Sequence, residues 1–96
     1  FSFESSNSFS DGSSMQVLYS GNWDGTPANI PSALWEPLAD VVIVSDSTPF
    51  GTWVFSNFAS LDCLSGTGHL AFKYEGSGDS SFDGTYEIDN ITLTTD

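Results

Sequence analysis

The chain has 96 residues, 39% of them hydrophobic, and carries thirteen Asp and Glu against a single Lys or Arg, for a formal net charge of −12. A chain of this length forms one domain around one core, and no apolar run approaches the ~18 residues of a membrane-spanning helix. Because there is no basic patch, nucleic acid and anionic membrane surfaces are excluded as partners. We therefore expect one acidic domain over residues 1–96.

The first predicted element is a Ser-rich strand over residues 1–9 with few apolar anchors. Phe1, Phe3 and Phe9 share one parity, whereas Glu4 and small polar residues occupy the other, which is the period-2 pattern of a strand. We interpret this segment as an edge strand or as a strand exchanged with a neighbouring chain, anchored by its three Phe side chains. The start at Phe1 without Met is typical of a processed chain or an excised fragment.

A second strand is predicted over residues 15–20, followed by a loop over 21–31 that contains Asn22-Trp23-Asp24 and two prolines. Proline excludes a central strand here. An indole beside polar side chains is suited to stacking and hydrogen-bonding a sugar ring, so Trp23, Asn22 and Asp24 are candidate ligand-binding residues. The alternative is that Trp23 caps the core.

The middle of the chain is predicted to supply the centre of the core. Residues 33–38 make a short edge-like segment, and residues 41–44 form a continuous β-branched run that is typical of a strand buried on both faces. Another strand is predicted over residues 52–57. Trp35 and Trp53 fall in these segments, and we interpret both as core residues.

Cys63 and His69 are the residues that raise the question of catalysis. Cys63 is the only cysteine, so no intramolecular disulfide forms, and its apolar neighbours indicate a buried thiol. His69 opens a predicted strand, and neither a Gly-x-Ser-x-Gly nor a His-Glu-x-x-His motif accompanies it. We therefore expect no catalytic residues and no enzymatic activity.

The clearest strand patterns lie near the C-terminus. Apolar residues alternate over 70–74, and again over 85–93, but in the second segment the apolar parity changes at Asp89-Asn90. A change of phase inside a strand requires a bulge or a twist, and such irregularities often redirect polar groups. We expect Asp89 to point at a specific partner.

Several short motifs between residues 15 and 95 resemble the C-terminal half of the choice-of-anchor J and cleaved-adhesin domains. The resemblance implies a galactose-binding-like, all-β antiparallel sandwich of the jelly-roll kind, in a secreted or cell-surface bacterial protein. The N-terminal strands of that family have no counterpart here, which implies a sandwich completed by a strand from a neighbouring chain. The motifs are Gln16-Val17-Leu18-Tyr19-Ser20-Gly21-Asn22-Trp23-Asp24-Gly25, Leu34-Trp35, Thr52-Trp53, Leu61-Asp62, Ala71-Phe72-Lys73-Tyr74 and Tyr86-Glu87-Ile88-Asp89-Asn90-Ile91.

Two sets of acidic residues are candidate calcium ligands. Asp79 and Asp83, with Gly84 after them, resemble part of a calcium loop, although a plain Asp-Gly hairpin turn explains Asp83-Gly84 equally well. The family resemblance implies a second site, in which Glu4 and Asp89 share a structural calcium that stabilises the fold by mass action. The alternative is that Asp89 accepts backbone N–H groups at the bulge.

Two functions from different classes fit these observations. The first is a non-catalytic extracellular adhesion or structural unit, stabilised by calcium, that assembles into a homo-oligomer or filament through β-strand pairing with residues 1–9 as the donated strand. The alternative is a carbohydrate-binding module of a larger secreted bacterial protein, with Trp23 against the glycan. A monomer with a solvent-facing Trp23 favours the second function, whereas residues 1–9 lying in another subunit's sheet favour the first.

Overall fold

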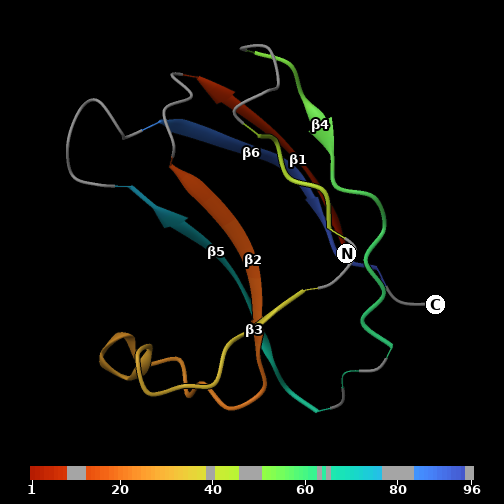
Figure 1. Ribbon diagram of the computed structural model, residues 1–96. Coiled ribbons are helices and arrows are strands. Elements are labelled where there is room, and N and C mark those ends of the chain that lie inside the picture. Colours follow the sequence, from red (N-terminus) through yellow and green to blue (C-terminus); the bar gives the residue numbers. More distant parts are fainter. Residues whose placement is uncertain are drawn as a thin grey trace.

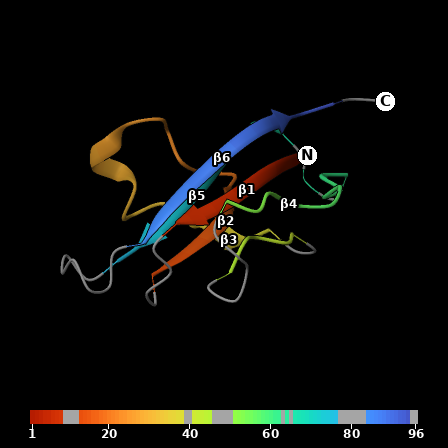
Figure 2. The same cartoon turned by 90° about the horizontal axis from the view of Figure 1, so that it is seen from above.

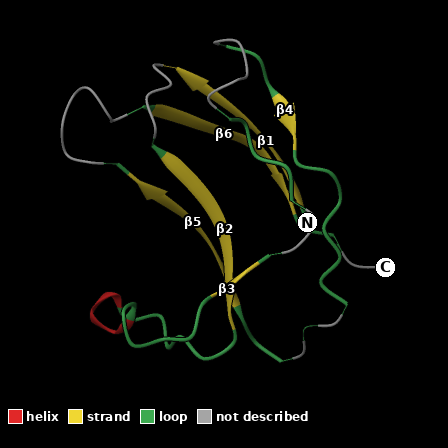
Figure 3. Cartoon of the chain, viewed as in Figure 1, coloured by secondary structure: helices red, strands yellow, loops and turns green. Residues whose placement is uncertain are grey.

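The computed structural model describes residues 1–8, 13–38, 41–45, 51–62, 64, 66–76 and 84–94. Two three-stranded antiparallel sheets, with strand orders β4-β1-β6 and β3-β2-β5, form two layers (Figures 1 and 2), which confirms the predicted all-β class and is consistent with a small β-sandwich. Among these residues strand and loop alternate with one short helical turn (Figure 3), and none of their helices is long and apolar enough to cross a membrane. The elements are β1 (Ser2–Ser8), β2 (Ser14–Ser20), the 3-10 turn η1 (Pro27–Asn29), β3 (Glu36–Pro37), β4 (Val54–Phe55), β5 (His69–Glu75) and β6 (Thr85–Thr92).

The core between the two sheets is aromatic. The Phe3 side chain has no exposed surface, and its ring meets the ring of Phe72 edge-on, with 5.1 Å between centroids. At the margin of this core Tyr74 of β5, which is 45% exposed, packs against Tyr86 of β6 at 5.9 Å. Val17, directly opposite Phe72 in the β2–β5 register, is also buried. The predicted alternation of β2, β5 and β6 is therefore confirmed, and it turns one parity of each strand toward this core.

β1 is the central strand of its sheet, so the predicted position of residues 1–9 at an edge is wrong. β1 pairs with β6 on one side and with β4 on the other. Its small polar side chains suit this central position because they hydrogen-bond the backbone of the segment over residues 41–45. The hydroxyl of Ser5 accepts from the backbone N–H of Val44 at 3.0 Å, and the side-chain amide of Asn7 donates to the carbonyl of Ser45 at 3.0 Å. Phe9 lies outside the described residues, and exchange of the strand between chains stays a prediction.

The predicted strand at residues 41–44 is also wrong, because the segment has no regular strand pairing. The backbone N–H of Val42 donates to the carbonyl of Ser56, whereas that of Val44 donates to a side chain, the Ser5 hydroxyl. Only Val44 is deeply buried, at 3% exposure, whereas Val42 is 42% exposed. The segment is therefore held by a backbone bond to Ser56 and by the Ser5 side chain on the inner face of β1, and it does not add a strand to the sheet.

Two asparagines with positive φ shift the side-chain alternation on both sides of β1. Asn90 has a φ of 51°, and β6 has one extra residue between the pairs Ser2↔Thr92 and Glu4↔Asp89, which confirms the irregularity predicted at Asp89-Asn90. Asn57 has a φ of 67° in the segment that follows β4. Asparagine tolerates this left-handed conformation better than most side chains, so both phase changes are encoded locally.

Candidate functional site

The segment between β2 and β3, residues 21–35, is held in place by the end of β2. Ser20 is fully buried, and its hydroxyl accepts hydrogen bonds from the backbone N–H groups of Asn22 at 3.3 Å and Trp23 at 3.1 Å. The side chain of Asn22 then accepts from the backbone N–H of Leu34 at 2.8 Å. The two ends of the loop are thereby joined, and in Figure 1 the loop with η1 extends beside the lower end of β2 and β5.

A groove of about 570 Å³ lies between this loop and the β2–β5 sheet. Leu18 and Ala71 are paired across β2 and β5, and they point away from the core because their neighbours Val17 and Phe72 point into it. The groove is therefore on the outer face of the sheet and mainly apolar. Its lining includes Leu18, Ala71 and Lys73 from the strands and Trp23, Ile30 and Trp35 from the loop.

Two tryptophans form the aromatic part of this groove. The ring centroids of Trp23 and Trp35 are 5.8 Å apart at an angle of 46°, and Trp23 also meets the ring of His69 edge-on at 4.8 Å. Both indole N–H groups donate within the loop, that of Trp23 to the carbonyl of Thr26 at 2.9 Å and that of Trp35 to the carbonyl of Ile30 at 3.0 Å. These bonds restrain the orientation of both rings, and both rings line the groove.

Trp23 also lines a smaller hollow of about 250 Å³, together with Asn22, Asp24 and Asn29 among others. The carboxylate of Asp24 accepts from the backbone N–H of Thr26 at 2.9 Å and from the side-chain amide of Asn29 at 2.6 Å. The first of these bonds is the main reason why the pKa of Asp24 lies below its usual range. Asn22, Trp23 and Asp24 thus line one hollow, and the two polar side chains hold the loop together; ligand binding by these three residues stays a prediction.

Trp35 and Lys73 are groove residues that the sequence did not single out. Trp35 was predicted in the core, but it lines the groove; Trp53, also predicted in the core, is 45% exposed. Lys73 forms an ion pair with Glu75, two residues further along β5, at 2.8 Å. The alternation over residues 70–74 placed Lys73 on the outer face, whereas the position of Trp35 depends on how the loop returns over the sheet.

Glu4 and Asp89, the proposed calcium pair, are direct neighbours across β1 and β6. The Asp89 carboxylate accepts from the backbone N–H of Asn90 at 2.8 Å, which is the kind of bond that the alternative interpretation of Asp89 predicted. The side-chain amide of Asn90 donates to Glu4 at 2.8 Å. In the described ranges no three His, Cys, Asp or Glu side chains gather in a metal-binding group, so these two carboxylates alone fall short of the six to eight oxygens that calcium takes.

Asp79, Asp83 and Cys63 lie outside the described residues. The predicted calcium loop and the buried thiol therefore stay predictions, as does calcium binding itself. His69 begins β5, an edge strand of its sheet, and its ring contacts Trp23.

Comparison of the chain with protein-family models, with curated proteins and with solved structures gives no match in any of the three. The resemblance to choice-of-anchor J and cleaved-adhesin domains therefore stays a prediction, and so does the extracellular location that it implies. The features that bear on function are the tryptophan groove of the β2–β5 sheet and the exposed face of the β4-β1-β6 sheet.

Proposed function

We propose that this chain is a non-catalytic carbohydrate-binding domain that holds sugar rings in the groove between Trp23 and Trp35. The observation that carries the proposal is the pair of indoles fixed side by side at 5.8 Å over an apolar floor. The C–H faces of a sugar ring pack on aromatic surfaces of this kind, and the groove volume of about 570 Å³ lies in the range of small-molecule sites, roughly 300–1,000 Å³.

The charges around the groove favour a neutral glycan. Lys73 contributes the only cation to the groove lining, and Glu75 pairs with it at 2.8 Å. The chain as a whole has a formal net charge of −12, which repels anionic ligands. An uncharged sugar avoids that repulsion, and its hydroxyl groups can hydrogen-bond the exposed ammonium and carboxylate at the rim.

The side chains that line the same groove are the reason for proposing that the chain is not catalytic. Hydrolysis of a glycosidic bond normally requires two carboxyl groups that flank the scissile bond. The described side chains that line this groove include Lys73 but no Asp or Glu. A binding role is supported by that composition.

Assembly by strand exchange is less well supported than glycan binding. Both edges of β1 are paired within the same chain, with β4 and β6. Exchange of β1 would break these pairings and the contact of Phe3 with Phe72 within one chain and re-form the same ones with a neighbour. Because the described residues already make these contacts within one chain, no contact among them points to a second copy, whereas the tryptophan groove supports glycan binding directly.

Binding of soluble neutral polysaccharides to the variant Trp35→Ala tests the proposal. A panel of galactan, mannan, xylan and mixed-linkage β-glucan is measured by affinity electrophoresis and isothermal calorimetry. For the polysaccharide that the native chain retains, we expect Trp35→Ala to weaken binding at least about tenfold, as for other aromatic hot spots.

Trp53→Ala is the matched control, because Trp53 is exposed and directly precedes β4, which belongs to the other sheet. It should bind the polysaccharide as the native chain does. Equal loss in the two variants, or no retention of any polysaccharide by the native chain, would show that the groove is not a glycan site.

A further inference from the structure

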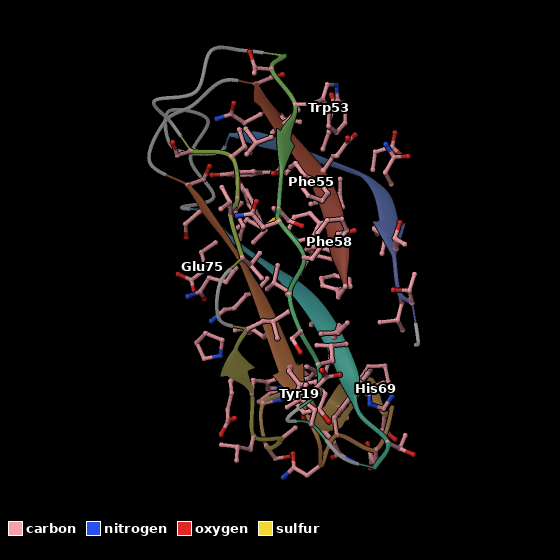
Figure 4. All side chains as sticks on the ribbon, turned by 90° about the vertical axis from the view of Figure 1, so that its right-hand side faces the viewer. Tyr19, Trp53, Phe55, Phe58, His69 and Glu75 are labelled. Carbon is pink, nitrogen blue, oxygen red and sulfur yellow. The ribbon has the colours of Figure 1, made fainter. Side chains whose placement is uncertain are left out.

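Three aromatic side chains are exposed together along the segment that contains β4. Trp53 is 45% exposed, Phe55 44% and Phe58 81%, and the rings of Phe55 and Phe58 meet edge-on at 5.2 Å. Figure 4 shows the three side chains following one another along this segment, away from Tyr19 and His69 on the other sheet. This aromatic row is separate from the tryptophan groove.

The backbone of this segment places the aromatic row outside. Ser56 and Ala59 are buried and hydrogen-bond with the backbone of Phe3 and Phe1, respectively. If the pairing of β4 with β1 continued regularly, Phe58 would lie opposite Phe1. Instead Ala59 is bonded to Phe1, so this segment contains one extra residue relative to β1. Asn57, with its φ of 67°, supplies that shift. As a result Phe55 and Phe58 project to the same side although they are three residues apart.

A row of carboxylates lies on the other side of β1, on the same face of the sheet. Phe55 is directly opposite Glu4, and Glu4 is directly opposite Asp89. Residues opposite each other in antiparallel strands project from the same face. The Phe55 ring and the carboxylates of Glu4 and Asp89 therefore form one line across β4, β1 and β6. In the next line Glu87 of β6 is opposite Ser6 of β1, which adds a third carboxylate beside a small side chain.

These carboxylates have no Lys or Arg of the chain to neutralise them. The only residue of that kind is Lys73, which pairs with Glu75 on the other sheet. Glu4 and Asp89 instead accept hydrogen bonds from Asn90, and these bonds leave their negative charge in place. The face therefore combines apolar aromatic surface with uncompensated negative charge.

We propose that this face, with Trp53, Phe55 and Phe58 along one side and Glu4, Glu87 and Asp89 along the other, docks a basic segment of a partner protein. An Arg or Lys side chain lying between the rows contacts an aromatic ring through a cation–π interaction and a carboxylate through a charge-assisted hydrogen bond. Aromatic residues are also enriched at the centres of protein interfaces. A second copy of this chain is a poor occupant, because each copy has a net charge of −12 and brings no cation beyond Lys73.

Binding of fluorescein-labelled nona-arginine, measured by fluorescence anisotropy at about 150 mM NaCl, tests the proposal; at this ionic strength the screening length of roughly 8 Å suppresses long-range attraction. Two matched pairs of variants separate docking from general attraction to an acidic protein. Glu4→Gln and Glu36→Gln each remove one exposed or half-buried carboxylate, and Phe58→Ser and Leu34→Ser each remove one exposed apolar side chain. Gln at position 4 retains an oxygen that accepts the bond from Asn90.

We expect Glu4→Gln and Phe58→Ser to raise the Kd about three- to tenfold, and the two control variants to change it less than about twofold. No binding of nona-arginine by the native chain, or equal weakening by both members of a pair, would overturn the proposal. Displacement of nona-arginine by the neutral polysaccharides described above would overturn it too, because the face would then be a sugar surface. Trp35→Ala should leave nona-arginine binding unchanged, so this result is independent of the outcome for the tryptophan groove.

Discussion

Phe3 connects the N-terminal strand to the opposite sheet more directly than any other residue described above. Its side chain is completely buried, its ring meets Phe72 of β5 and Phe1 at centroid distances of 5.1 and 5.6 Å, and its backbone N–H donates to the hydroxyl of Ser56 at 2.9 Å. The packing of the two layers thus depends on a residue that sequence alone placed in an edge or exchanged strand.

Phe3→Ala should lower the free energy of unfolding by ~3–5 kcal/mol, because it removes a large buried ring and leaves a cavity. Small domains have total stabilities of roughly 5–15 kcal/mol, so much of the margin would be lost. Urea unfolding followed by tryptophan fluorescence measures the change. Phe58→Ala, which truncates a ring that is 81% exposed, should change stability by no more than about 0.5 kcal/mol; similar losses in both variants would contradict the assigned burial.

At the scale of elements, the loop over residues 21–35 depends on the ionised carboxylate of Asp24. The hydrogen bonds from Thr26 and Asn29 lower the pKa of Asp24. A folded-state pKa below the unfolded value means that the contribution of Asp24 to loop stability is fully present above the ordinary aspartate pKa of about 3.9 and disappears as the pH falls through the lower, folded value. Acid therefore weakens the loop, and higher pH does not.

We predict that lowering the pH from about 6 to about 3 loosens the wall of the groove in the native chain more than in the variant Asp24→Asn, which has no carboxylate to protonate. The amide resonances of Thr26 and Asn29 in heteronuclear NMR spectra report on the loop directly. Other acidic residues titrate in the same interval, so the comparison with Asp24→Asn is the informative one. Identical shifts of both resonances in the two proteins would show that Asp24 does not hold the loop.

The strands that the sequence predicted well are those in which alternation identifies one buried face. β2, β5 and β6 follow their period-2 patterns, and the change of parity at Asp89-Asn90 locates the bulge in β6. The strand predicted at residues 41–44 was wrong because a run of β-branched residues indicates burial but does not identify a strand for the segment to pair with. The N–H of Val42 bonds the carbonyl of Ser56 and that of Val44 bonds the side chain of Ser5, and a pattern of apolar residues contains no information about such bonds.

The candidate site was predictable to the extent that it is local. Trp23 was identified from its polar neighbours in a short loop, whereas the contribution of Trp35 requires the loop to return over β2 and β5. The exposed aromatic row depends on the extra residue at Asn57, because uninterrupted alternation would place Phe58 on the side opposite to Phe55. Long-range register of this kind is set by several strands together, so no single segment encodes it.

The molecule as a whole is thin, and its charge is almost entirely of one sign. Its principal extents are 40 × 33 × 17 Å and its radius of gyration is 14.4 Å, somewhat above the ~13 Å typical of a compact chain of about 100 residues. A thin sandwich has a small core and two broad outer faces. Here one outer face carries the tryptophan groove and the other carries the aromatic and carboxylate rows, while the net charge of −12 opposes compaction.

Raising NaCl from about 10 to about 150 mM should therefore stabilise the chain, because the screening length falls from roughly 30 to roughly 8 Å and the carboxylates repel one another less. We expect the Tm to rise by several degrees; for a domain of this size ~4–8 °C corresponds to 1 kcal/mol. Glu36→Lys, which reduces the net negative charge by two units at an exposed position, should have a higher Tm at low salt and a smaller salt response. A Tm that falls with NaCl would show that attractive ion pairs outweigh the repulsion.

Replacing NaCl by CaCl₂ at the same ionic strength separates general screening from specific binding, since a calcium ion bound only by the folded chain adds stability by mass action. A further rise in Tm that a chelator reverses would establish the calcium site, and loss of that increment in Glu4→Gln would place the ion at the Glu4 and Asp89 pair.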